Sequence, residues 1–388
     1  MTNDDTLQTV ASEGAPPPKA DSKPRRRVPS ISRGRVFVNV TLIFICLIWL
    51  IPTVGLLVSS FRQPDDIQTS GWWTVLPHPD TVMVAELPLP EGDRNGVMTI
   101  EGATGTFEQF REGVESPDGM VVIWVGNRRA GRIEIHAQAI TANTNLGIDN
   151  YGKVLTGKEY TITTADGSTQ QVQGDDMSGA FLNSLVVAIP STLIPILVAA
   201  FAAYGFAWMQ FTGRAVLFIL VVAMLAVPLQ IALIPILRDY VAVGLNGTYL
   251  SLWLAHTGFG LALAIFLLYN YISELPRELM ESAFIDGASH FQTFWRLIMP
   301  LSIPALAAFA IFQFLWVWND YLVALIFIGA RLENQVVTQR LAEIVGSRGD
   351  DWHLLTSGAF VSMLLPLFVF FALQRYFVRG LLSGSVKG

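Results

Sequence analysis

Long apolar stretches alternate with polar ones along this chain. Six of them are long enough to cross a membrane as helices, because about 20 residues at 1.5 Å per residue span roughly 30 Å of hydrocarbon. The pattern therefore predicts an all-α membrane protein with six transmembrane helices. The six stretches cover about residues 36–59, 181–208, 215–237, 250–272, 303–329 and 357–378.

Between the first two apolar stretches, at residues 62–178, the pattern changes completely. Four short runs, TVMVAEL, GVMTIEG, MVVIWVG and RIEIHAQ, predict β-strands, and GNRRAG between the last two predicts a hairpin loop. This region holds seventeen acidic and eight basic residues, the opposite of a cytoplasmic loop. We interpret it as an inserted, β-rich extracytoplasmic (periplasmic) domain; the alternative is a loosely ordered loop.

The chain ends indicate the orientation. Residues 1–30 are rich in Pro, Ser, Asp and Ala and are predicted to be a disordered cytoplasmic segment. A basic cluster follows at residues 23–35, so the positive-inside rule places the N-terminus in the cytoplasm. A secretory signal peptide is the alternative, but the next apolar stretch is too long and lacks a cleavage site. Arg375, Arg379 and Lys387 place the C-terminus inside too, although Arg331, Arg340 and Arg348 fall in a predicted outer loop.

A charged, amphipathic segment at residues 276–300 separates two apolar stretches and is predicted to lie outside the hydrocarbon. Pro276 suits the first turn of a helix, Gly287 interrupts the pattern, and Ser289 with Gln292 resembles a capping box. We expect two short helices that meet at the glycine, the second of which ends at Pro300. The apolar residues at helical spacing are Leu279, Ala283, Phe284, Ala288, Phe291, Phe294, Trp295 and Ile298.

Two interpretations of this apolar stripe compete. A helix pair lying on the lipid headgroups would show the same stripe. Such helices are normally richer in Lys and Arg, whereas acidic residues slightly outnumber basic ones here. We favour docking in a groove of a cytoplasmic partner. Glu281 and Asp286 would then meet basic groups of that partner, and Phe284 and Phe291 would fill its pockets.

Composition excludes several classes of function. The mean hydropathy is +0.47 and only 14% of residues are charged, against about 25% in average soluble domains. Cys46 is the only cysteine, so an intrachain disulfide or a cysteine-rich zinc site is excluded. The five histidines show no metal-ligand spacing, and no GxxxxGK[ST] phosphate loop is present. We therefore predict no catalytic or metal-binding residues, and no ATP hydrolysis by a phosphate loop in this chain.

The segment ESAFIDGA, then nine residues between Gly287 and Leu297, and then Met299 and Pro300, resemble the "EAA" loop of ABC importer permeases. Glu281, Ala283, Gly287 and Pro300 match the family pattern outright. Ser282, Leu297 and Met299 are small or aliphatic replacements for the usual residues. In that family the loop is the coupling helix, which sits in a cleft of the ATPase subunit.

The resemblance extends over most of the chain outside residues 1–30 and 62–178. NSLVVA at 183–188, WND at 318–320 and the terminal QRYFVRGLLSGSVKG resemble the maltose-type branch of sugar importers. The large region 62–178, which ends in GIDNYGKVLTG at 147–157, resembles the α-glucoside permeases. This implies a type I importer permease in the bacterial cytoplasmic (inner) membrane that imports an α-glucoside such as maltose, trehalose or sucrose.

The resemblance also implies partners and contact residues. The expected partners are a second permease subunit, an ATPase dimer that binds ATP and Mg, and a periplasmic or lipoprotein sugar-binding protein; no cofactor of this chain's own and no nucleic acid are expected. The expected ATPase-coupling residues are Glu281, Ala283, Phe284, Asp286, Gly287, Phe291 and Pro300. The C-terminal tail expected in the ATPase dimer interface comprises Ser383, Gly384, Val386, Lys387 and Gly388.

The expected domain order follows from these assignments. Between the disordered N-terminus and the β-rich insert lies the first transmembrane helix, and after the insert come the permease core and the tail. The core includes a cytoplasmic coupling loop at 273–300. The ranges are 1–30, 31–61, 62–178, 179–380 and 381–388.

Polar residues inside apolar stretches are candidates for a substrate pathway. Aromatic rings beside amide and carboxylate groups suit a sugar, and the candidates are Gln313, Trp316, Asn319, Asp320 and Tyr321. The alternative is that WND packs and caps helices near the outer membrane boundary, and the family resemblance implies that the other permease subunit holds the sugar.

Two other classes of function remain as alternatives. A secondary sugar transporter could have six spans, but internal inverted repeats are not evident. A membrane-anchored sensor would use the insert to bind a ligand, but the sequence shows no cytoplasmic signalling domain.

Overall fold

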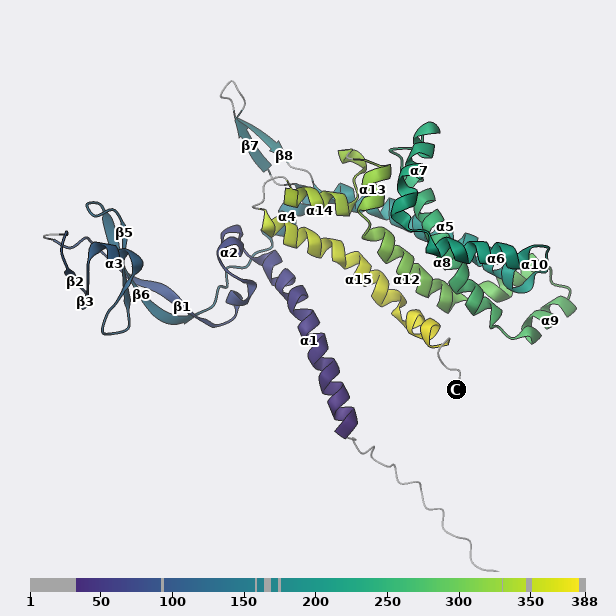
Figure 1. The fold of residues 1–388 in the computed structure, drawn as a ribbon, viewed down its shortest axis with the longest axis horizontal. Coiled ribbons are helices and arrows are strands. Elements are labelled where there is room, and N and C mark those ends of the chain that lie inside the picture. Colours follow the sequence, from purple (N-terminus) through teal and green to yellow (C-terminus); the bar gives the residue numbers. More distant parts are fainter. Residues whose placement is uncertain are drawn as a thin grey trace, which may run out of the picture. The chain divides into compact units, whose positions relative to one another are not determined.

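The computed structural model describes residues 33–91, 94–157, 159–163, 169–173, 176–329, 331–346 and 351–383, which form mostly helices (Figure 1). The predicted disordered segment 1–30 and the tail residues Gly384–Gly388 lie outside these ranges. The chain divides into two compact units, Met1–Ile51 and Pro52–Gly388, and the boundary falls inside the first helix.

Four of the described helices are long and apolar enough to cross a membrane. Two bent helix pairs raise the number to six if each pair is one span. The strands of the structure lie between the first and the second of the long helices. The four long helices are α1 (Arg33–Phe61), α5 (Met177–Trp208), α8 (Tyr249–Ser273) and α15 (Trp352–Ser383).

The predicted continuous helix over 215–237 is wrong. The structure has α6 (Arg214–Ala223), a short 3-10 turn and then α7 (Leu229–Ala242), with a bend of 103° between the two helices. Pro228 explains the break, because a proline pushes the preceding residue away from helical angles. Val227 accordingly has extended angles of φ −79° and ψ 117°.

The predicted continuous helix over 303–329 is also interrupted. Helix α12 (Ile303–Trp318) ends at its C-cap Asn319, and a separate short helix, α13 (Leu322–Phe327), follows. The Asp320 carboxylate accepts a hydrogen bond from the Val323 backbone N–H (3.0 Å) and so caps the first turn of α13. A side-chain acceptor at this position competes with continuation of the helix.

The packed centre of the helical region is formed by α5, which lies against α8 and α12, while α12 also packs against α15. Two clusters of buried apolar side chains fill these contacts. The first surrounds Leu252, Trp318 and Phe327, near the beginning of α5. The second surrounds Ala203, Leu268 and Phe309 and includes Met280 and Phe294 from the amphipathic loop.

Four of the strands between α1 and α5 form an antiparallel sheet in the order β1-β6-β5-β4. All four predicted runs fall on strands, and the GNRRAG hairpin is confirmed because Gly126 pairs with Gly131. Trp124 and Ile133 are buried between the sheet and α3 (Phe107–Glu112). The strands of this sheet are β1 (His78–Leu87), β4 (Val114–Glu115), β5 (Val121–Gly126) and β6 (Gly131–Thr141).

Shorter elements complete the chain. Two further hairpins each pair two strands, and short helices connect the longer ones. The hairpins are β2 (Met98–Ile100) with β3 (Ala103–Gly105) and β7 (Glu159–Thr163) with β8 (Thr169–Gln173). The short helices here are α2 (Pro64–Thr69), η1 (Trp72–Val75), α4 (Asp149–Thr156), η4 (Leu332–Asn334) and α14 (Val337–Gly346).

A buried polar junction joins the end of α1 to α4. The Asn150 side-chain amide donates to the Ser60 and Arg62 carbonyls (3.0 and 2.9 Å). The Tyr151 hydroxyl lies 2.6 Å from that of Ser60. Arg62 is itself buried, and its guanidinium donates to the Asp66 carbonyl (2.7 Å). The segments before and after the sheet are thereby held together at one place.

We expect Asn150→Ala to destabilise the protein by about 1–3 kcal/mol, because it leaves two buried carbonyls without a donor. Asn145→Ala is the matched control, since Asn145 is exposed, and we expect a change within about 0.5 kcal/mol. Thermal unfolding of the detergent-purified protein checks both. Equal melting temperatures for the two variants would contradict this role of Asn150.

Candidate functional site

The amphipathic segment forms two short helices that meet at a glycine, as predicted. Helix α9 (Arg277–Ile285) ends in a Schellman motif: the Gly287 N–H donates to the Phe284 carbonyl, and the Ala288 N–H to the Ala283 carbonyl (both 3.0 Å). Gly287 has φ +78°, a left-handed conformation that favours glycine. The bend is therefore fixed by hydrogen bonds and by the absence of a side chain.

The predicted capping box starts the second helix, α10 (His290–Thr293). The Gln292 backbone N–H donates to the Ser289 hydroxyl (3.3 Å), and the Ser289 N–H donates to the Gln292 side chain (2.9 Å). Both prolines lie differently from expectation. Pro276 is the N-cap of α9 instead of a first-turn residue.

Pro300 does not end the second helix. The chain stays helical through a π-helical turn (Phe294–Ile298) and α11 (Met299–Leu301), and bends by 71° into α12 after Ser302. Pro300 is the second residue of α11 and directly follows the π-helical turn.

One face of this loop is buried against the helical bundle. Met280, Phe294 and Ile298 are each at most 2% exposed. Phe294 stacks on Phe201 of α5 at 4.2 Å between ring centroids. The predicted apolar stripe therefore consists of two faces, because Phe294 and Ile298 belong to the protein core.

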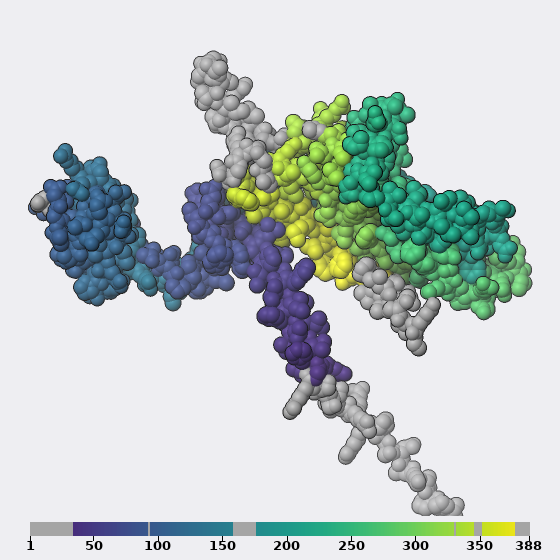
Figure 2. All heavy atoms as spheres, in the orientation of Figure 1, coloured from purple at the N-terminus to yellow at the C-terminus, as the bar shows by residue number. Residues whose placement is uncertain are grey.

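The other face is exposed and apolar. Ile285 is 84% exposed, Phe291 66% and Phe284 39%. Acidic side chains accompany them, since Glu281 and Asp286 are exposed as well. Of the seven expected coupling residues only Ala283 is half-buried. Figure 2 shows the atoms of this segment, in green, at the surface of the helical bundle. Such a face can bury apolar area against a partner and meet its basic groups.

Two polar contacts join the last turns of α5 to its neighbours, one to the loop and one to the end of α8, and sequence reasoning missed both. The Tyr204 hydroxyl lies 2.9 Å from Nδ1 of His290, the first residue of α10. The Trp208 indole N–H donates to the Ile272 carbonyl at the end of α8 (3.2 Å). Tyr204 and Trp208 are four residues apart and lie on one face of α5, but only the fold brings that face to the loop.

The expected pathway residues separate into two groups. Gln313 and Trp316 line a cavity of about 620 Å³ between the α6–α7 pair, α8 and α12. Asp239 and Tyr240 add polar groups to this cavity, and most of its other lining residues are apolar. Gln313 is fully buried, and its amide Nε2 donates to the carbonyls of Ser191 (3.2 Å) and His256 (3.3 Å).

The remaining three pathway candidates lie at the α12–α13 break. Asn319 and Asp320 cap helices there, and Tyr321 is 41% exposed. The Asp320 carboxylate lies 3.8 Å from Nε2 of the buried His256, next to a void of about 10 Å³, about the size of one water. Sequence reasoning missed His256, because nothing near it along the chain marks it.

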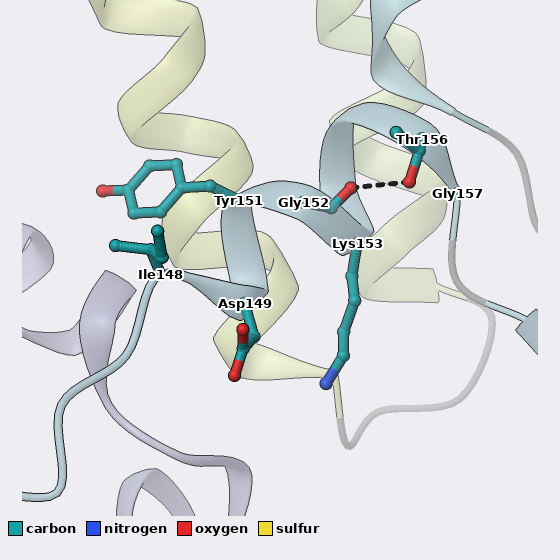
Figure 3. A pocket seen from close by; sticks show the side chains of 7 residues that line it. All are labelled: Ile148, Asp149, Tyr151, Gly152, Lys153, Thr156 and Gly157. Carbon is teal, nitrogen blue, oxygen red and sulfur yellow. Dashed lines mark hydrogen bonds between the residues drawn. The ribbon is translucent and has the colours of Figure 1, made fainter.

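A surface hollow of about 910 Å³ lies along α4 (Figure 3). Asp149 and Lys153 project from the same side of this helix, whereas Tyr151 points away toward its contact with Ser60. The Thr156 hydroxyl donates to the Gly152 carbonyl (2.8 Å). The hollow therefore presents one carboxylate and one ammonium group. In the part of the chain that the structure describes, no three His, Cys, Asp or Glu side chains form a potential metal site.

Comparisons with known proteins identify the family. Residues 195–383 match the binding-protein-dependent transport system inner membrane component. Over 367 residues the chain is 46% identical to the alpha-glucoside transport system permease protein AglG of Rhizobium meliloti, covering 90% of this chain and 97% of that one. The chain belongs to the ABC sugar importer permeases. It is thus a membrane component for sugar import, and permease subunits are not themselves enzymes.

The permease has further relatives. It is 45% identical over 350 residues to the osmoprotective compounds uptake permease protein GgtD of Synechocystis, which covers 90% of this chain and 91% of that one. Among solved structures it resembles a chain of a bacterial ABC transporter involved in the import of the polysaccharide alginate. That likeness has a TM-score of 0.57 at 14% identity and covers 89% of this chain and 98% of that one, so it shows a shared fold.

Two phenylalanines three positions apart test the two faces of the loop. We expect Phe294→Ala to destabilise the permease by about 3–5 kcal/mol, because the side chain is buried. Phe291→Ala should change stability by no more than about 0.5 kcal/mol, because that ring is exposed. Thermal unfolding in detergent measures both, and a Phe291→Ala variant as unstable as Phe294→Ala would show that the outer face is also core.

Proposed function

We propose that this chain is the permease subunit of an ATP-driven importer, and that the coupling loop at residues 273–300 docks in a cleft of a separate ATPase chain. The observation that carries the proposal is the exposed face of Phe284, Ile285 and Phe291. Its opposite face is packed on α5, and the loop continues into α12. A movement imposed on the exposed face would therefore reach the membrane helices directly.

In this proposal the permease has six transmembrane spans, with each bent pair counted as one, and both termini in the cytoplasm. Support comes from the two ends of α5. Tyr204, near its C-terminal end, contacts the loop. Near the other end, Asn183 donates to the Glu333 and Gln335 carbonyls, and Ser184 accepts from the Val337 N–H. The loop and the segment 331–346 thus lie at opposite ends of one membrane-long helix, as inner and outer faces require.

We place the sheet region outside the cytoplasm, as a β-rich insert between the first and second spans. Its acidic balance supports this placement, and so does its position at the end of α1 opposite to the basic N-terminal segment. The division into segments 1–30, 31–61, 62–178, 179–380 and 381–388 remains a prediction.

The mechanism is alternating access. The permease performs no covalent step; its helices exchange between outward-open and inward-open arrangements, and closure of the ATPase dimer around ATP and Mg biases that exchange. The permease's own contribution is a stiff connection. The Schellman bend at Gly287 sets the angle of α9, and the Tyr204–His290 contact fixes α10 to α5.

The partners in this proposal are a second permease subunit, an ATPase dimer and a periplasmic or lipoprotein sugar-binding protein. The tail from Ser383 to Gly388 inserts into the ATPase dimer; Ser383 ends α15, and the rest lies outside the described residues. The substrate is an α-glucoside such as maltose, trehalose or sucrose, which the relative from Rhizobium meliloti supports.

For the pathway through this subunit we propose the cavity lined by Gln313 and Trp316 and the adjoining α12–α13 break. The indole of Trp316 offers a face on which a sugar ring can stack, and Tyr240 and Asp239 add polar groups to an otherwise apolar wall. Asn319, Asp320 and Tyr321 add polar side chains at the α12–α13 break.

A secondary sugar transporter without an ATPase partner is the alternative function, and the source of energy separates the two. We expect uptake of radiolabelled maltose, trehalose or sucrose to stop in cells depleted of ATP while the proton gradient is maintained. Collapse of the gradient at normal ATP should leave uptake in place. Uptake that persists without ATP would disprove the importer proposal.

We expect Phe291→Glu to abolish co-purification of the ATPase chain and to abolish uptake, because a charge replaces an apolar contact in the docked face. The amount of permease in the membrane should not change, since Phe291 is 66% exposed. Ile148→Glu is the matched control: Ile148 is 74% exposed and lies next to α4, so both readouts should stay at wild-type level. A Phe291→Glu variant that retains the ATPase would contradict docking through this face.

We also expect Gly287→Pro to abolish uptake while the protein still reaches the membrane. Proline fixes φ near −65°, whereas Gly287 has φ +78°, and proline removes the N–H that bonds to Phe284. The bend between α9 and α10 is then lost. Wild-type uptake by this variant, at equal membrane levels, would mean that the loop does not transmit the motion.

A further inference from the structure

Helix α5 carries prolines at two positions inside its apolar length, Pro190 and Pro195. A proline has no backbone N–H, so the carbonyl four residues earlier loses its helical partner. For Pro195 that carbonyl belongs to Ser191. In hydrocarbon such a carbonyl finds no water, and leaving it unpaired costs free energy.

A side chain from a neighbouring helix supplies the missing donor. The Gln313 amide of α12 donates to the Ser191 carbonyl at 3.2 Å. Gly260 of α8 makes room for it, because a Cβ there would lie 2.5 Å from Gln313 Oε1. The amide is fully buried between three helices, and its position matches the gap that Pro195 leaves.

The same arrangement recurs five residues later in α12, at its last residue. Pro366 lies inside α15 and frees the carbonyl of Ser362. The indole N–H of the buried Trp318 donates to that carbonyl at 3.0 Å. Helix α12 thus completes the backbone of α5 through Gln313 and that of α15 through Trp318.

A third case involves α8 instead of α12. Pro190 frees the carbonyl of Val186, and the indole N–H of Trp253 donates to it at 2.9 Å. Two further prolines lie past the first turn of described helices, namely Pro52 in α1 and Pro235 in α7. Among the described contacts no side chain donates to the carbonyls they free, and both helices have mostly exposed side chains. The replacement donors therefore occur where helices pack together.

We propose that Gln313 and Trp318 are positioning residues that pass the movement of α12 to the proline-weakened turns of α5 and α15. The inference rests on the proposed function of the loop, because α12 follows that loop directly. At a proline a helix lacks one backbone hydrogen bond and bends more easily. A side-chain donor that replaces this bond sets the bend angle from outside the helix, so a shift of α12 changes the shape of two other helices.

The test separates this role from a merely structural one. In Gln313→Leu the Ser191 carbonyl loses its donor, whereas Pro195→Ala restores a backbone N–H to that carbonyl. We expect the single variant Gln313→Leu to lose roughly tenfold in maximal uptake rate, on the scale of one hydrogen bond. The double variant Gln313→Leu with Pro195→Ala should regain the wild-type melting temperature and still transport slowly.

The sugar concentration for half-maximal uptake, measured with maltose, trehalose and sucrose, should stay at the wild-type value in these variants. ATP hydrolysis by the purified complex should continue without matching uptake. Recovery of uptake together with stability in the double variant would overturn the proposal, as would wild-type uptake by Gln313→Leu. A changed half-maximal concentration at an unchanged maximal rate would also overturn it, because that result assigns Gln313 to the sugar.

The pair Trp318→Phe and Pro366→Ala repeats the test at α15, in case the first double variant does not fold. The pair Trp253→Phe and Pro190→Ala is the matched control, because it concerns α8: its double variant should regain both stability and uptake. Co-purification of the ATPase separates the two proposals. The ATPase should co-purify with every Gln313 variant. If the docking proposal fails, Phe291→Glu and Gly287→Pro will still co-purify the ATPase and will still take up sugar.

Discussion

The need to pair every backbone polar group inside hydrocarbon governs this structure. Most carbonyls in a helix satisfy that need within their own helix, but prolines in α5 and α15 prevent it at three places. At each of these places a buried or half-buried Gln or Trp side chain from the next helix donates the missing hydrogen bond. Specific hydrogen bonds as well as apolar packing therefore link α8 and α12 to the backbone of α5. Apolar packing alone would allow the helices to slide past one another in lipid.

Helix α5 is consequently the common element of the permease. Its first half meets α8 at Trp253, α12 at Gln313 and the segment 331–346 through Asn183. Its last turns contact the amphipathic loop through Tyr204 and the end of α8 through Trp208. If the loop docks on a partner, as proposed, its inner face must be rigid while its apolar outer face stays uncovered. The stacked rings of Phe201 and Phe294 and the Schellman motif at Gly287 provide that rigidity without using the outer face.

Local patterns predicted the elements well wherever the cause is local. The four strand-forming runs, the hairpin, the glycine bend and the capping box at Ser289 all depend on residues within a few positions of each other, and all are present. The breaks at Pro228 and Asn319 were missed, because apolar periodicity continues across them. Whether a proline bends a helix slightly or ends it depends on what can pair with the freed groups, and neighbouring helices decide that.

The candidate site was predictable only in part, for a related reason. Periodicity identified a stripe that included Phe291 and Phe294, but it could not tell which ring would be buried, since that depends on Phe201, over ninety positions away. His256 and Tyr204 were not found at all, because their partners are also distant in the sequence. Polarity drew attention to Gln313 correctly, but it could not reveal that the amide completes the backbone of another helix.

The hydrogen bonds of Gln313 also limit what it can do for a sugar. A neutral amide has two N–H groups, and here Nε2 donates to Ser191 and His256. Only Oε1 remains without a hydrogen-bond partner among the described residues, and the close approach of Gly260 confines it. A sugar hydroxyl could accept from Nε2 only in place of the Ser191 or the His256 carbonyl, and loss of the Ser191 bond would free α5 to bend. The N–H that holds Ser191 therefore cannot serve a sugar and the shape of α5 at the same moment, whereas stacking on Trp316, on the same face of α12, leaves that bond intact.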